Sequence, residues 1–147
     1  MKLPPNLFEA LKLLKEKREL DIYWKILAGE KAGDVFKELP IYYQTDSHLL
    51  SGIVDALIAT HQSITIIDWK SSAFLASLKQ SERLQQIRNQ LLIYANSFKK
   101  FAGNKKLNIL AIGIGLQASK PPKIDVIINE EVFPQKQLFE GIEKCTN

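Results

Sequence analysis

Cysteine is almost absent from this chain of 147 residues, which contains Cys145 and no other thiol. One thiol cannot form an internal disulfide, and it cannot supply a four-thiolate zinc site or an iron–sulphur cluster. Chains of oxidising compartments commonly carry paired cysteines. We therefore expect a cytoplasmic protein.

Long hydrophobic runs are also absent. A membrane-spanning helix needs roughly 20 consecutive apolar residues, and the longest apolar run here, residues 107–116, is interrupted by Asn108 and two glycines. That run is typical of a buried strand. Residues 12–19 mix charged and apolar side chains, unlike a signal peptide. We expect no membrane association.

The composition is that of a globular domain. Hydrophobic residues make up 46% and charged residues 24%, which argues against a disordered chain. The length is that of one domain, so we expect a single domain over residues 1–147. Lys and Arg number 20 against 16 Asp and Glu, and the net charge of +4 permits a polyanionic partner without requiring one.

Hydrophobic periodicity predicts elements in the order α-β-β-β-α-β-β-α. They are a helix over residues 6–20 with a continuation over 22–27, strands over 35–43, 49–60 and 64–70, a helix over 82–101, strands over 107–116 and 124–128, and a short amphipathic helix after Pro134. Three strands with short connections form an antiparallel meander. A strand after a long helix indicates a crossover onto the same sheet. We expect an α/β fold with a mixed central sheet flanked by helices.

Charged side chains stand at the end of the third predicted strand. Asp68 and Lys70 are two positions apart, so both point to one face of the sheet. Asp55 lies on the preceding strand and comes close to Asp68 if the strands pair near that end. Two neighbouring carboxylates repel each other, and a divalent cation such as Mg²⁺, which prefers oxygen ligands, resolves the repulsion. The alternative is an Asp68–Lys70 salt bridge with Asp55 solvated.

Two polar residues on the long predicted helix could extend this site. Gln90 and Tyr94 are spaced i, i+4, so they share a face beside the apolar stripe of the helix. They either reach the charged strand ends or occupy the boundary between the buried and exposed faces.

The motifs together resemble the PD-(D/E)XK nuclease superfamily, and most of all its RecB-type exonuclease domain. The resemblance lies in the strings Gly52-x-x-Asp55, Asp68-x-Lys70 and Gln90-x-x-x-Tyr94. Residues 38–41, Glu-Leu-Pro-Ile, are similar to the Glu-x-Pro-apolar strand that often precedes the glycine-led strand. The resemblance covers residues 35–98 and implies a restriction-endonuclease-like α-β-β-β-α-β core.

The resemblance implies a metal-dependent deoxyribonuclease, in which a water activated by Mg²⁺ or Mn²⁺ hydrolyses a phosphodiester bond, with a role in DNA repair, recombination or defence. Asp55 and Asp68 would be metal ligands, with the backbone carbonyl of Trp69 a third. Lys70 would position or activate the attacking water.

Other site residues are implied with alternatives left open. Gln90 and Tyr94 would brace the site or contact the nucleic-acid backbone. Glu38 is a further candidate ligand, although a role in bracing its strand is favoured. The family usually carries a His or Glu ligand on its first helix, but no His precedes His48. The acidic candidates there are Glu9, Glu16, Glu19 and Glu30.

Because the sequence does not single out one of these candidates, it leaves open an alternative function, a catalytically inactive nuclease-like fold that binds nucleic acid or a protein partner. The chain contains no Gly-x-x-x-x-Gly-Lys phosphate loop and is too short for a helicase motor. Processive cutting would therefore need a homo-oligomer or a helicase partner.

Overall fold

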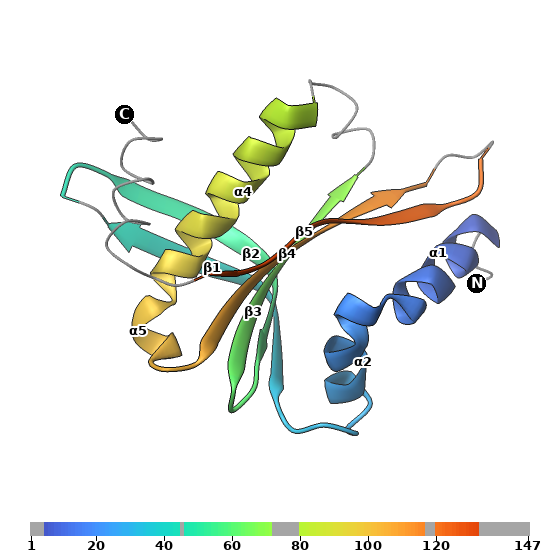
Figure 1. Ribbon diagram of the computed structural model, residues 1–147, viewed down its shortest axis with the longest axis horizontal. Coiled ribbons are helices and arrows are strands. Elements are labelled where there is room, and N and C mark those ends of the chain that lie inside the picture. Colours follow the sequence, from blue (N-terminus) through green and yellow to red (C-terminus); the bar gives the residue numbers. More distant parts are fainter. Residues whose placement is uncertain (1–4, 45, 72–79, 117–119, 133–147) are drawn as a thin grey trace.

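A five-stranded sheet with the order β1-β2-β3-β4-β5 forms the centre of the computed structural model, which describes residues 5–44, 46–71, 80–116 and 120–132 (Figure 1). The strands are β1 Asp34–Gln44, β2 Leu49–Ala59, β3 Ser63–Ser71, β4 Lys106–Gly115 and β5 Lys123–Val132. The helices are α1 Pro5–Glu16, the 3-10 turn η1 Arg18–Leu20, α2 Asp21–Leu27, α4 Gln80–Ser97 and α5 Lys99–Ala102. The helix expected after Pro134, with Cys145, lies outside the described residues.

The sheet is mixed, as the element order predicts. β3 and β4 are parallel, and the chain between them contains α4. The pairs β1–β2, β2–β3 and β4–β5 are antiparallel. The expected α/β fold, with a meander followed by a helical crossover, is therefore confirmed.

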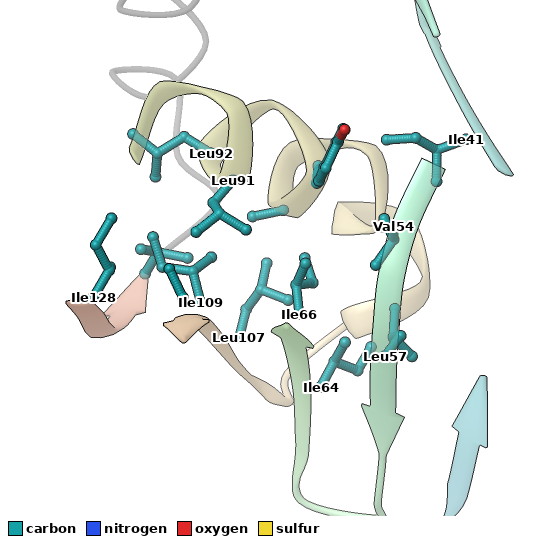
Figure 2. Packing of buried hydrophobic residues seen from close by; sticks show 14 of the residues in the cluster. Ile41, Val54, Leu57, Ile64, Ile66, Leu91, Leu92, Leu107, Ile109 and Ile128 are labelled. Carbon is teal, nitrogen blue, oxygen red and sulfur yellow. The ribbon is translucent and has the colours of Figure 1, made fainter. Parts of the chain in front are cut away.

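Helices cover both faces of the sheet, with α4 on one face and α1 to α2 on the other (Figure 1). On the α4 face, Leu91 lies above Ile109 of β4, and Leu92 lies on the side of Ile128 of β5 (Figure 2). Ile66 of β3 belongs to the same cluster. On the other face, a second cluster includes Leu20 and Tyr23 from the helices together with Ile67, Leu110 and Ile112 from the strands. Each of β3 and β4 therefore buries alternate residues in two cores, as strands of a covered sheet do.

Several predicted boundaries were wrong. The first helix ends at Glu16 rather than residue 20, because Lys17 is extended and η1 then places Leu20 in the core. The carbonyl of Leu14, near this break, accepts a 3.1 Å hydrogen bond from the Trp24 indole. The helix expected over residues 82–101 begins at Gln80 and is divided at Phe98. The last strand reaches Val132, because β5 pairs with β4 along its length.

Midway along the β1–β2 hairpin, the side chains of each strand change the face of the sheet to which alternate residues point. Residues 37 and 39 of β1 pair with residues 56 and 54 of β2, so Glu38 and Asp55 lie opposite each other. On one side of this pair, Ala56 packs in the core under α2, whereas Val54 on the other side packs under α4. Residues two apart normally share a face, so the strands reverse their faces here. Glu38 has a φ of 52°, in the left-handed region that costs about 1–2 kcal/mol for a residue with a Cβ.

None of the helices in the described part of the chain is long and apolar enough to cross a bilayer.

Candidate active site

Asp55 stands where two strands of the meander separate. The β2–β3 ladder runs from the pair Ala59–Ile64 to the pair Ala56–Ile67 and ends there. Beyond its end, Oδ2 of Asp55 accepts a 2.8 Å hydrogen bond from the backbone N–H of Trp69. A side-chain carboxylate thus replaces the backbone acceptor that the ladder no longer provides. This bond holds Asp55 beside the end of β3.

Asp68 is the next residue along β3, and it is 5% exposed. Its Oδ2 lies 3.1 Å from Nζ of Lys70, an ion pair between side chains that are 8% and 17% exposed. The pKa of Asp68 is raised from 3.8 to about 6, chiefly by burial and by the neighbouring Asp55, which accepts a hydrogen bond from protonated Asp68; Lys70 opposes the rise. The two carboxylates therefore meet, as the strand positions suggested. The Asp68–Lys70 salt bridge of the alternative interpretation is present as well, but Asp55 is held by the Trp69 N–H.

Lys70 is linked to α4 by an amide. Its Nζ donates a 3.4 Å hydrogen bond to Oε1 of Gln90, and Nε2 of Gln90 donates a 2.9 Å bond to the hydroxyl of Tyr94. Burial raises the pKa of Tyr94, and the negative charge of Asp68 adds to the rise. The i, i+4 pair on the helix is thus joined to the Asp68-x-Lys70 strand, which the spacing alone left open.

Gly52 is explained by the ring of Tyr94. A Cβ at this position would lie 2.9 Å from both Cε1 and the hydroxyl oxygen of Tyr94, closer than real Cβ contacts. The glycine therefore lets α4 approach β2 closely enough for the Tyr94 hydroxyl to meet Gln90. The sequence motif contains Gly52, but the physical requirement for a glycine becomes visible only in the packing of Tyr94.

The residues present fit a divalent cation. Within the described residues, Oδ2 of Asp68 is a buried oxygen with no hydrogen-bond partner of normal geometry. The adjacent Asp55 adds a second carboxylate, and two carboxylates are a common protein contribution to a Mg²⁺ site. The N–H of Trp69 points to Asp55. The N–H and C=O of a strand residue face the same neighbouring strand. The carbonyl of Trp69 is therefore expected on the side of β2, where Asp55 lies.

The further acidic metal ligand that the family usually carries is not found beside Asp55 and Asp68 among the described residues. Among residues 5–44, 46–71, 80–116 and 120–132, no three His, Cys, Asp or Glu side chains form a group able to hold a metal ion. Glu38 lies opposite Asp55 in the β1–β2 register, but it does not complete such a group. The same holds for the first-helix candidates, which are Glu9, Glu16, Glu19 and Glu30.

A cavity of about 600 Å³ opens beside Asp55 on the α2 side of the sheet. Its lining includes Tyr23, Lys37 and Glu38 together with Trp69. The rings of Tyr23 and Trp69 meet edge to face, with centroids 6.4 Å apart. Sequence reasoning missed Tyr23 and Lys37, because neither belongs to a motif and only the packing of α2 brings Tyr23 to this point.

Comparison with known proteins agrees with these motifs. A family model described as the PD-(D/E)XK nuclease superfamily matches residues 5–144. No curated protein matches the chain.

Proposed function

Because the chain belongs to the PD-(D/E)XK nuclease superfamily, we propose that it is a metal-dependent deoxyribonuclease that hydrolyses phosphodiester bonds. The observation that carries this proposal is the meeting of Asp55, Asp68 and Lys70 at the point where β2 and β3 separate. A surface salt bridge would not explain why a second carboxylate is held against a buried, poorly satisfied one. A role in DNA repair, recombination or defence is part of the same proposal.

Asp55 and Asp68 would hold Mg²⁺ or Mn²⁺, with the carbonyl of Trp69 as a third oxygen. The bound ion would supply positive charge at the scissile phosphate and lower the pKa of a water molecule. Lys70, held beside Asp68 at 3.1 Å, would orient that water and stabilise the charge that shifts to the attacking and leaving oxygens. The protein would therefore contribute mainly position and electrostatics.

Gln90 and Tyr94 would act as positioning residues. Gln90 accepts from Lys70 and donates to Tyr94, so its amide orientation is fixed by partners on both sides. This arrangement limits the positions that the flexible lysine side chain can adopt. We infer that it keeps the ammonium at the reacting phosphate, which lowers the entropic cost of reaching the transition state.

The test compares two substitutions that remove different parts of the site. Asp68→Ala should lose Mn²⁺ binding, measured by calorimetry, together with cleavage of labelled DNA. Lys70→Ala should leave Mn²⁺ binding nearly intact and lower cleavage by roughly 10²-fold or more, because its charge acts chiefly in the transition state. Lys123→Ala, which removes a highly exposed lysine of β5, is the matched control and should cleave normally.

The proposal fails if Lys70→Ala cleaves as fast as the parent at saturating Mg²⁺. The alternative of a nuclease-like fold that binds without cutting rests on the additional acidic ligand, which the described residues do not supply. It would be supported if the parent binds DNA but neither binds Mn²⁺ at millimolar concentration nor cleaves. In either case, affinity for DNA should fall steeply as salt rises, because phosphate contacts release counterions.

A further inference from the structure

A second groove lies beside the candidate site, between α4 and β2. It has a volume of about 330 Å³, within the range of about 300–1,000 Å³ that small-molecule sites occupy. Gln86, Asn89 and Gln90 of α4 line it together with Ser51, and Leu50 and Ile93 supply apolar surface. Gln90 belongs to both places, because the same side chain accepts a hydrogen bond from Lys70. The groove therefore adjoins the site around Asp68 through Gln90.

Among the residues that the structure describes, the lining of this groove contains no charged side chain, which is unusual for an open helix face in a chain whose residues are 24% charged. Within residues 84–97, Arg88 is the only charged residue. Its guanidinium pairs with Glu130 of β5 at 2.8 Å. The open side of α4 thus presents amides, whose chemistry suits a polar ligand without net charge.

The amides are oriented by their neighbours. The carbonyl oxygen of Gln86 accepts a 3.4 Å hydrogen bond from Arg83, and that of Asn89 accepts a 2.9 Å bond from Gln85. In each case the oxygen is engaged along the helix, so the NH₂ group is available to a ligand. Asn and Gln amides commonly bind the polar edges of nucleobases, and side chains such as Leu50 and Ile93 suit the apolar face of a base.

Cations stand at both ends of this row of amides. Lys70 contacts Gln90 at one end, and Arg83 contacts Gln86 at the other. The three amides of α4 thus lie between Arg83 of the same helix and Lys70 of β3. This order matches a phosphate, a nucleoside and a further phosphate of one strand. Resting on the proposed nuclease function, we propose that this groove binds the nucleoside next to the scissile phosphate, through the amides of Gln86 and Asn89.

The experiment measures fluorescence anisotropy of a short single-stranded oligodeoxynucleotide bound to the full chain, with Ca²⁺ in place of Mg²⁺. An oligonucleotide of equal length in which every base is replaced by an abasic sugar keeps the phosphates and removes the bases. The parent should bind the base-containing strand more tightly. Each of Gln86→Ala and Asn89→Ala should reduce this preference about three- to tenfold, the usual range for one lost hydrogen bond.

Controls separate the groove from general effects. Gln62→Ala and Asn104→Ala replace exposed amides in turns at the far end of the sheet and should keep the parent's preference. The salt dependence of binding should be unchanged in the two alanine variants of the groove, because the contacts that they lose are uncharged. Gln86→Glu, which keeps the size of the side chain but removes the donor, serves if an alanine variant folds poorly, and circular dichroism checks folding.

The proposal is overturned if the parent binds both strands equally, or if Gln86→Ala and Asn89→Ala keep the full preference for bases. The nuclease proposal is tested by a separate measurement. It fails if the parent hydrolyses neither DNA nor bis(p-nitrophenyl) phosphate, a substrate that has no nucleoside. If the chain prefers the base-containing strand but hydrolyses neither substrate, the groove proposal is supported and the nuclease proposal is refuted.

Discussion

We expect Asp68 to lower the free energy of unfolding of the metal-free protein at neutral pH. Its pKa is raised from 3.8 to about 6, first by burial and then by Asp55. The ionised form is therefore disfavoured in the folded state relative to the unfolded chain. Replacing Asp68 by Asn mimics the protonated carboxyl and removes this cost, so Asp68→Asn should raise the free energy of unfolding while abolishing cleavage.

The sign and size of the effect come from proton binding. Between about pH 4 and pH 6 the folded protein keeps a proton on Asp68 that the unfolded chain has released, so the free energy of unfolding falls as pH rises through this window. The difference between 3.8 and about 6, at about 1.4 kcal/mol for each pKa unit, corresponds to about 3 kcal/mol. For a chain of this size that is a rise in Tm of roughly 6–12 °C at pH 7.5.

The measurement is urea and thermal unfolding of the parent and of Asp68→Asn from pH 3.5 to 8, with EDTA present. The variant's advantage should be full at pH 7.5 and should shrink to nearly zero by pH 3.5, where Asp68 is protonated in both states. Asp125→Asn, which alters an exposed carboxylate of β5, should show no such trend. An Asp68→Asn protein that is no more stable than the parent at pH 7.5, or is equally favoured at every pH, would refute the reasoning.

Three further substitutions test other parts of the structure by urea unfolding. Gly52→Ala should lower the free energy of unfolding by about 1–3 kcal/mol, because its Cβ overlaps the ring of Tyr94. Adding Tyr94→Leu should recover stability, and an unchanged loss in the double variant would contradict this explanation. Glu38→Gly should be about 1 kcal/mol more stable than Glu38→Ala, because only glycine adopts a φ of 52° without strain; equal stability would show that the strain is absent. Arg88→Ala should cost at most about 1 kcal/mol and less at high salt, because both partners of its pair with Glu130 are about 40% exposed; a larger, salt-insensitive loss would contradict that.

Local rules were sufficient where the relevant contacts lie within one element. The alternation of residues 64–70 places Asp68 and Lys70 on one face, and the i, i+4 spacing of Gln90 and Tyr94 joins them on α4; both relations follow from the geometry of strand and helix. The order of strands and helices followed from hydrophobic periodicity for the same reason. Boundaries were less predictable, because the break at Lys17 depends on where Leu20 enters the core.

Relations between elements were decided by the tertiary structure. Asp55 meets Asp68 because the β2–β3 ladder ends at Ala56, and no local pattern marks that end. The raised pKa of Asp68 depends on burial and on a second charge, so it belongs to the assembled sheet and not to the residue.

The role of Gly52 is another consequence of packing. It becomes a requirement only when α4 brings the Tyr94 ring against β2. The exchange of faces at Glu38 and Asp55 likewise depends on how two strands pair. The sequence by itself determined the order of the elements as far as β5 and the residue types of the site. The sheet register and the packing of α4 determined which atoms meet, because those contacts join residues far apart along the chain.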